Sequence, residues 1–409
     1  MKRIQPLFFL VVLAAMSISA LAQTSPKMPV AGPNPIFKSV PPIKLPARAN
    51  AAIVPQNITG IISVPNFTRS FFTRGTRYRY TMIGNDPTRG GTTDIPARIL
   101  AVSLRLQNAD LKTFTLVPVH EFAEYSLASP NFQRADYSSG NDLQYADAVQ
   151  RAQFFNIMKP DWHTRLAPAH IVDKLTLDIP YYTTVQQNGK DLKVRTYFSG
   201  KADDGSTFVL LLESFFDQQI FDVVNNAVNK GDYQPSALNV AIFPNTYLFA
   251  GVSNGQIVGC CVGGFHTYFT DGASPEHRWV FAYASYMSPG LFQGGAADVT
   301  ALSHEISESF NDPFVNNQVH AWQYPGMPGS CQDTLETGDP LEVLANGVFP
   351  IPLRADGKPF TFHPQTEALW QWFAEKSHSS AIDAAYSYPD ITALTAPATP
   401  FPHKTCPTN

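Results

Sequence analysis

The sequence has few charged residues and no concentrated block of them. Asp, Glu, Lys and Arg make up only 15% of the 409 residues, and the formal net charge is -4. Nucleic-acid binding depends on clustered Lys and Arg side chains that neutralise phosphates, and no such basic run is present. The composition therefore argues against a nucleic acid as a partner.

Several short motifs that would indicate a bound nucleotide or a cysteine metal site are also missing. The sequence contains neither the GxxxxGK[ST] loop nor the GxGxxG fingerprint, so no phosphate-binding turn is indicated. Its four cysteines, Cys260, Cys261, Cys331 and Cys406, include no CxxC pair. A zinc site built from cysteine is therefore not supported.

The first residues have the features of a secretory signal. MKR is a basic start, PLFFLVVLAAM is an apolar stretch too short to cross a bilayer as a helix, and ALAQ offers a cleavage site after Ala22. No later segment is long and apolar enough to be a transmembrane helix. We expect residues 1–22 to be removed on export, which predicts a secreted or periplasmic protein without an integral membrane segment.

Export makes the four cysteines candidates for disulfide bonds. Cys260 and Cys261 are adjacent in what reads as a strand, so we expect their side chains to point to opposite faces and not to bond each other. One bridge is expected from Cys406 to either Cys331 or Cys260. Free buried thiols are the alternative for the adjacent pair.

The chain divides into segments of different composition. Residues 23–57 are rich in proline and have no apolar period, which predicts a linker or a strap on the surface. Residues 58–204 are expected to form a β-rich domain, because runs such as ARILAVSLRL and KLTLDIPYYTTV alternate apolar and polar residues. The sequence leaves open whether this part is separate or wraps around the second half. One helix, over 141–158, interrupts this part.

Longer helices and very apolar strands alternate in residues 205–409. The pattern predicts a helix over 214–230 and three strands, ALNVAIF, QIVGCCVGGFHTYF and RWVFAYASYM. A helix that carries HEISE follows, then a loop-rich region and a last helix at TEALWQWFAEK. We therefore expect an α+β fold with a β-rich N-terminal half and a mixed sheet in the second half.

The stretch DVTALSHEISESFNDP, residues 298–313, contains an HExxE motif. Residues at i and i+4 of a helix lie about 40° apart around its axis, so His304 and Glu308 can reach one ion together. Winding the segment on a helix separates an apolar stripe from a polar one. The apolar stripe holds Val299, Leu302, Ile306 and Phe310, and the polar stripe holds His304, Glu308 and Asp312.

A second HExxE occurs in VHEFAEY, with His120 and Glu124. Pro118 precedes it and SLASP follows, so at most two turns of helix are available. We interpret this second motif as a coincidence.

The polar stripe at residue 304 also has an ordinary interpretation. A helix with an apolar stripe usually turns its polar residues to water, and His304, Glu305 and Glu308 could be no more than a solvated face. The context favours a site, because the acidic cluster DTLETGDPLE follows downstream. Its acids are Asp333, Glu336, Asp339 and Glu342.

With these motifs, residues 237–342 resemble a zincin-type metallopeptidase domain. More remotely, GCCVGGFHTYF followed by YASY and HEISESFNDP is similar to bacterial relatives of the phosphate-induced, EXORDIUM-like extracellular proteins. The zincin resemblance implies that His304 is a metal ligand, that Glu305 is the general base, and that Glu308 stands where the family has its second histidine. It also implies a third ligand from downstream, here Glu336 or Asp339.

A glutamate at 308 changes the chemistry of such a site. Two neutral histidines and one carboxylate leave a bound zinc ion with net positive charge, whereas one histidine and two carboxylates bring the formal charge to zero. The site is then richer in oxygen, so manganese or calcium become alternatives to zinc. His266 and His320 could each restore a second imidazole, although each could equally be a structural histidine. Asp312 is a candidate third ligand or a neighbour of the ligands.

Two functions follow from these patterns. The first is a secreted metal-dependent hydrolase in which Glu305 acts on water for cleavage of a peptide or related bond. The second is a non-catalytic extracellular protein with a relict or structural metal site, which binds at the cell surface or on polysaccharide. A glycosidase that uses Glu305 or Glu308 with Asp339 is a weaker third reading, because the sequence does not fix the spacing of the carboxylates.

Overall fold

The computed structural model describes residues 35–46, 60–137, 142–187, 189–292, 294–325 and 331–399. The expected signal segment and most of the expected proline-rich linker lie outside these residues. The described chain is a mixed, strand-rich α and β protein built on a curled mixed sheet. No described helix is long and apolar enough to cross a membrane.

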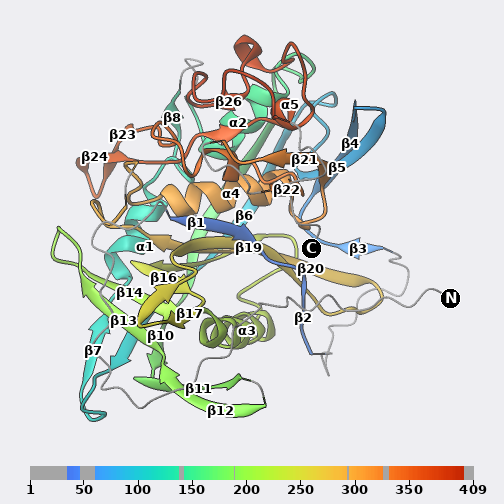
Figure 1. The fold of residues 1–409 in the computed structure, drawn as a ribbon. Coiled ribbons are helices and arrows are strands. Elements are labelled where there is room, and N and C mark those ends of the chain that lie inside the picture. Colours follow the sequence, from blue (N-terminus) through green and yellow to red (C-terminus); the bar gives the residue numbers. More distant parts are fainter. Residues whose placement is uncertain are drawn as a thin grey trace.

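Twelve strands form the central sheet (Figure 1). Eight of them follow one another in the order β10 (His163–Ile179), β6 (Thr92–Gln107), β15 (Leu238–Pro244), β20 (Glu276–Tyr286), β19 (Val262–Thr270), β16 (Thr246–Phe249), β14 (Thr207–Leu212) and β13 (Tyr197–Lys201). The other four pair at the sides: β1 (Ile36–Ser39) and β2 (Ile43–Lys44) with β19, β3 (Ile61–Ile62) with β20, and β7 (Phe114–Val117) with β6. Parallel and antiparallel pairings both occur, as predicted for the second half.

The remaining strands form two-stranded hairpins and small ribbons around this sheet. They are β4 (Asn66–Thr73) with β5 (Thr76–Ile83), β8 (Ala135–Asp136) with β9 (Asp142–Leu143), β11 (Tyr182–Gln187) with β12 (Lys190–Arg195), β17 (Gly251–Ser253) with β18 (Gln256–Val258), β21 (Gln318–Gln323) with β22 (Cys331–Thr334), β23 (Ile351–Ala355) with β24 (Lys358–Phe362), and β25 (Glu367–Ala368) with β26 (Ser387–Tyr388). The helices are α1 (His120–Leu127), α2 (Tyr145–Gln153), α3 (Glu213–Lys230), α4 (Thr300–Asn311) and α5 (Trp370–Phe373), with 3-10 turns η1 (Asp339–Leu341) and η2 (Ile382–Ala384).

The expected boundary between residues 204 and 205 does not separate two sheets. It falls in the turn of the β13–β14 hairpin, and β15 pairs with β6 on one side and with β20 on the other. Strands from the N-terminal half therefore extend the same sheet that the C-terminal half forms. Both parts share one hydrophobic core on each face.

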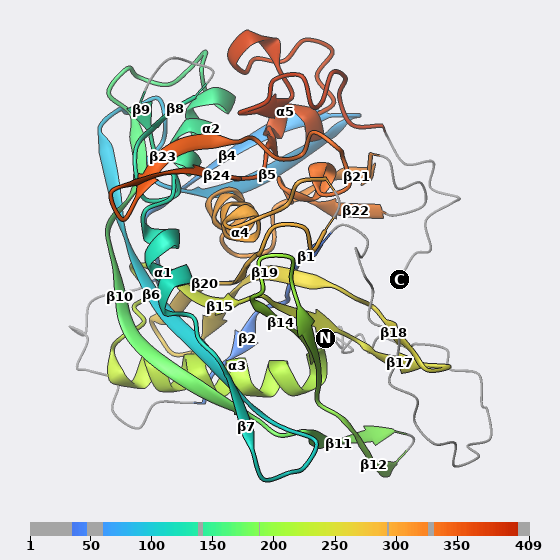
Figure 2. The same cartoon turned by 90° about the vertical axis from the view of Figure 1, so that its left-hand side faces the viewer.

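Two helices cover opposite faces of this sheet, α3 on one and α4 on the other (Figure 2). The alternation of side chains along β20 explains why both faces are apolar. Tyr283 packs against Phe216 of α3, whereas Val280 belongs to the cluster that contains Leu302 and Ile306 of α4. The apolar stripe predicted for the HEISE helix therefore packs on the sheet.

The other side of α4 is not open to water. The ribbon of β21 and β22, the helix α5 and the β23–β24 hairpin lie over it, and every residue of α4 is buried. Trp322 and Trp372 anchor this layer in a separate aromatic cluster. The interpretation of His304, Glu305 and Glu308 as a solvated face is therefore wrong.

Several elements differ in length from the sequence-based expectation. The helix expected over 141–158 is only α2, and the last helix is only α5, which is four residues long. The expected strand QIVGCCVGGFHTYF is interrupted at Gly259–Cys261, between β18 and β19. The helix over 213–230 agrees with its prediction to one residue.

This interruption removes the basis of the expectation for the adjacent cysteines. Cys260 and Cys261 lie before β19, in no strand, and a cis peptide bond joins them. The argument from strand alternation does not apply there, and the two sulfur atoms lie within disulfide distance of each other. Cys331 is also in a disulfide. The expected partner Cys406 lies outside the described residues.

Candidate metal centre

Two histidines and a set of carboxylates from distant parts of the chain meet between the sheet and α4. His304, Glu305 and Glu308 come from α4, and His266 comes from β19. The acids on the covering layer are Glu336, Asp339, Glu342 and Glu367. All except Glu342, which is partly buried, have side chains that are fully buried.

His304, Glu308 and Asp339 form the group that the sequence predicted. One donor atom from each lies within 4.8 Å of the others. Nε2 of His304 is 3.0 Å from Oε2 of Glu308 and 3.5 Å from Oδ1 of Asp339. Donor atoms around a tetrahedral ion with bonds near 2.1 Å lie roughly 3.4 Å apart, so these three donors have the spacing of metal ligands.

Hydrogen bonds around His304 leave its Nε2 atom free for an ion. Nδ1 of His304 lies 3.1 Å from Oε1 of Gln365, and Nε2 of Gln365 donates to the Gly338 carbonyl at 2.6 Å. Since the amide nitrogen of Gln365 is used by that carbonyl, its oxygen faces the imidazole and accepts a hydrogen bond from Nδ1–H. The imidazole is therefore held in the tautomer that presents a lone pair at Nε2.

Asp339 and Glu308 are positioned in the same way. Tyr324 donates its hydroxyl to Oδ2 of Asp339 at 2.7 Å, and Nε2 of Gln332 donates to the same oxygen. The backbone N–H of Gly338 donates to Oε1 of Glu308 at 3.0 Å. In both carboxylates one oxygen is held by the protein, and the other, Oδ1 of Asp339 or Oε2 of Glu308, has no hydrogen-bond partner.

Gln365 gives a direct test of this arrangement. We expect Gln365→Leu to weaken metal binding by about 10- to 100-fold, because the imidazole loses the group that sets its tautomer and orientation. Competition with a chromophoric chelator measures the change. The matched control is Gln133→Leu, because Gln133 is exposed and makes its side-chain hydrogen bond to the Leu127 carbonyl and not to a residue of the centre. Equal affinities in Gln365→Leu and wild type would contradict the role given to Gln365.

The cluster has a large excess of negative charge. No lysine or arginine of the described residues forms an ion pair with Glu305, Glu308, Glu336 or Asp339. Burying carboxylates without a cation is unfavourable, because the low-dielectric interior does not replace their hydration. The buried side chains are therefore groups that could hold a metal ion.

The pKa values of the buried groups also reflect the excess of negative charge. Burial raises the pKa of Glu305 to about 7 and that of Glu336 to about 8. Burial alone would lower the pKa of His304, but the adjacent Glu308 carboxylate outweighs it, and the pKa is raised above its ordinary value. Glu308 is the exception, since the two nearby imidazoles offset the effect of burial and hold its pKa low. Without a cation the cluster therefore retains protons at neutral pH.

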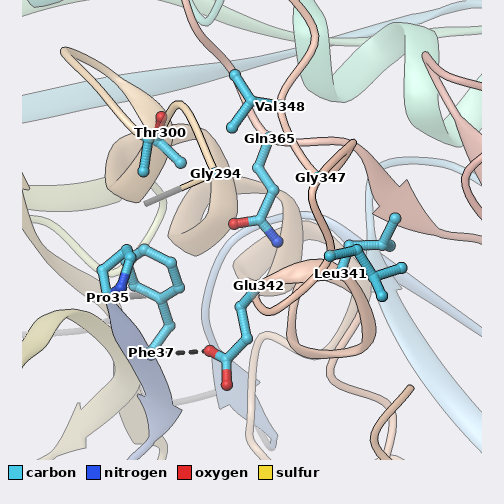
Figure 3. Close-up of a pocket in the computed structure, with 11 residues that line it drawn as sticks. Pro35, Phe37, Gly294, Thr300, Leu341, Glu342, Gly347, Val348 and Gln365 are labelled. Carbon is cyan, nitrogen blue, oxygen red and sulfur yellow. Dashed lines mark hydrogen bonds between the residues drawn. The ribbon is translucent and has the colours of Figure 1, made fainter. Parts of the chain in front are cut away.

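The N-terminal strand covers one side of this centre. The ring of Phe37 in β1 lies 4.2 Å from the imidazole of His304, centroid to centroid, and its backbone N–H donates to Oε2 of Glu342 at 3.1 Å. Phe37, Glu342 and Gln365 line a small cavity (Figure 3). The cavity reaches the side chains around His304 but is not lined by His304 itself.

Of the other predicted ligands, Glu336 lies in the centre and Asp312 does not bind there. Glu336 belongs to the cluster but faces His266, with 3.6 Å between its Oε2 and Nε2 of the histidine. Asp312 is not in either ligand group, because its oxygens accept the backbone N–H groups of Asn316 and Asn317 beyond the end of α4. The expectation of Asp312 as a ligand is therefore not supported, since the backbone at the helix end already uses its carboxylate.

Of the two histidines considered as a second imidazole, only one lies here. Nδ1 of His266 is 3.2 Å from Oε2 of Glu308. His320 instead lies 3.4 Å from Glu375, away from the centre. The second HExxE motif is on the surface helix α1, where His120 and Glu124 are exposed beside Lys174, which agrees with its interpretation as a coincidence.

Reading the sequence missed two residues of the centre and one short motif that has no role there. Gln365 and Glu367 join the centre from a loop and a short strand, and no motif marks them. A GxSxG pattern, GVSNG at 251–255, was also overlooked. It lies in the exposed β17–β18 hairpin and is not followed by a helix, so it lacks the geometry of a nucleophile elbow.

The chain matches no protein-family model, and no curated protein and no solved structure is significantly similar to it. The resemblance to zincins and to EXORDIUM-like proteins therefore stays a prediction, and the function has to be argued from the centre itself.

Proposed function

We propose that the protein is an exported metal-dependent hydrolase of zincin type, in which His304, Glu308 and Asp339 hold a divalent ion. The observation that carries the proposal is the meeting of these three side chains, fully buried and at ligand spacing, with Glu305 beside them and no ion pair to a lysine or arginine among the residues that the structure describes. A bound divalent ion would lower the pKa of a water molecule and polarise a carbonyl group.

Glu305 supplies the proton acceptor in this proposal. Both oxygens of its carboxylate lack a hydrogen-bond partner, and the residue precedes Ile306 on the helix that carries two of the ligands. A base must lie within hydrogen-bond reach of the water that it deprotonates, and Glu305 is the free carboxylate adjacent to His304 in the chain. The substrate class proposed is a peptide or a related acyl bond.

Zinc is the ion we propose first. Imidazole nitrogen and carboxylate oxygen are both zinc ligands, and a nitrogen ligand disfavours calcium, which prefers oxygen. Two carboxylates also make manganese an acceptable occupant. Export to the periplasm or the medium, indicated by the N-terminal signal, completes the proposal.

Glu305→Gln is the variant that tests the chemistry. We expect turnover to fall by about 10²- to 10⁴-fold, since glutamine cannot accept the proton, while the ion at His304 stays bound. Zinc-loaded protein would be incubated with a mixed peptide pool, and the products would be identified by mass spectrometry. Glu121→Gln, which changes the glutamate of the surface HExxE on α1, is the control and should behave like wild type. Cleavage by Glu305→Gln at the wild-type rate would remove Glu305 as the base.

The second candidate is a non-catalytic extracellular protein with a structural metal site, which binds a partner at the cell surface or on polysaccharide. The position of Phe37 favours it, because its ring lies against His304 and no donor atom of the centre is exposed. In that case the metal-loaded protein cleaves no peptide, and removal of the ion lowers its stability.

A further inference from the structure

A second set of donors lies next to the first and shares one member with it. His266, Glu305 and Glu308 each place one donor atom within 4.8 Å of the others. Nδ1 of His266 is 3.2 Å from Oε2 of Glu308 and 3.7 Å from Oε2 of Glu305. The same Oε2 of Glu308 lies 3.0 Å from Nε2 of His304. One carboxylate oxygen therefore lies between two imidazoles.

His266 has the environment of a metal ligand and not that of a satisfied core histidine. It is fully buried on β19, and neither ring nitrogen has a hydrogen-bond partner. Its Nδ1 faces Glu305 and Glu308, while its Nε2 faces Glu336 at 3.6 Å. A ligating histidine commonly directs one nitrogen to the ion and the other to an orienting carboxylate, which is the position that Glu336 occupies.

The strand opposite Glu305 is shaped to leave room for its carboxylate. Gly264 lies two residues before His266, so both face α4, whereas Phe265 between them packs in the core of the other face. A Cβ atom at Gly264 would lie 2.5 Å from Oε1 of Glu305. Glycine inside a strand loses packing, and a close approach of this kind explains its presence.

One ion does not account for both groups. His266 and His304 do not fall into a single set of donors, although both sets contain Glu308. The formal charge points the same way. The carboxylates of the two groups, Glu305, Glu308 and Asp339, carry three negative charges when ionised, and one divalent ion leaves one of these charges unbalanced.

We propose that Glu308 bridges two divalent ions, the first held with His304 and Asp339 and the second held with His266 and Glu305. The second ion is a transition metal such as zinc or manganese, because its donors are one imidazole and two carboxylates. The proposal rests on the proposed function for the first ion. Paired ions about 3.5–4 Å apart, bridged by a carboxylate, are a known arrangement in hydrolytic centres. Glu305 then binds the second ion through one oxygen and keeps the other for the proton.

The test is a count of ions in single variants. The exported protein is stripped with chelator, reloaded with zinc or manganese, and analysed for metal per chain. We expect two equivalents in wild type, one in His266→Ala and one in His304→Ala. In the manganese-loaded protein, electron paramagnetic resonance should show a coupled pair in wild type and an isolated ion in His266→Ala. The control His320→Ala, which changes the histidine outside the centre, should keep two equivalents.

Gly264→Ala is a second variant that leaves His266 in place. Its new methyl group displaces the Glu305 carboxylate, so we expect it to lose the same ion as His266→Ala. One equivalent in wild type, lost in His304→Ala and kept in His266→Ala, would overturn the second ion but leave the first. One equivalent lost in both histidine variants would mean a single shared ion and would also overturn it. No metal in wild type would remove the proposed function as well.

Discussion

Glu308→Gln should remove all bound metal, because this carboxylate belongs to both donor groups. Glutamine keeps the shape of the side chain and can still accept the hydrogen bond from the Gly338 N–H, but it loses the negative charge. We expect the affinity for zinc to fall by at least about 100-fold. Loss of a group that only orients a metal ligand already weakens binding by up to about that factor. Metal analysis of protein purified without chelator measures the loss directly.

The same variant should lose the stabilisation that the metal provides. A ligand at 100 times its dissociation constant stabilises the folded state by about 2.7 kcal/mol, so zinc should raise the unfolding temperature of wild type and not that of Glu308→Gln. The surface motif offers a matched control, since Glu124→Gln changes the equivalent position of the exposed HExxE and should leave metal content and stability unchanged. A metal-loaded Glu308→Gln protein would contradict the assignment of Glu308.

The stability of the metal-free protein should fall as the pH rises from about 5 to 8. Burial raises the pKa of Glu305 to about 7 and of Glu336 to about 8, so in this range the folded state holds protons that the unfolded state has released. The free energy of unfolding then decreases with pH, by about 1.4 kcal/mol per unit for each such group. His266 and His304 act in the same direction, because their pKa values are also raised in the folded state. The stability that this provides is fully present below the pKa of the unfolded state and is lost as the pH rises through the pKa of the folded state.

Metal should reverse this trend, since an ion replaces the protons on the ligands. Glu308, with its lowered pKa, contributes stability that is lost only as the pH falls below the ordinary glutamate value, so it does not disturb this window. Thermal unfolding at pH 5, 6, 7 and 8, with chelator and with zinc, measures both effects. We expect a zinc-induced increase that grows with pH, and a flatter chelator curve for Glu336→Gln. An increase in unfolding temperature of the same size with zinc at pH 5 and at pH 8 would contradict the proposal that the ion replaces protons on the ligands.

Helices and strands were predicted correctly where the apolar pattern within the segment itself determines them. The helix α3 and strands β6, β15 and β20 follow the apolar pattern of their own residues, and the patterns were read correctly. The sequence left open how the two parts of the chain are related, because the pairing between β6 and β15 joins residues that are far apart in the sequence. No periodicity within either strand indicates its neighbour.

The shortened elements have a similar cause. The segment at 256–269 is uniformly apolar and glycine-rich, which gives no sign that Gly259 to Cys261 leave the strand. The expected last helix ends after Phe373, and Glu375 adopts a left-handed backbone conformation there. Trp372 and Phe373 of α5 pack against Trp322, and this tertiary contact is not visible in the local sequence.

By itself the sequence determined the chemistry along α4. An α-helix places residues four apart on one face, so the order of His304 and Glu308 was sufficient to predict that they could share an ion, and the downstream acids supplied Asp339. Only the tertiary structure decided that the polar face is buried, that His266 joins it, and that Asp312 does not. Strand pairing and the layer over α4 bring these groups together through long-range contacts. The same carboxylates on a surface would be hydrated by water, but buried as they are here they need a cation to balance their charge.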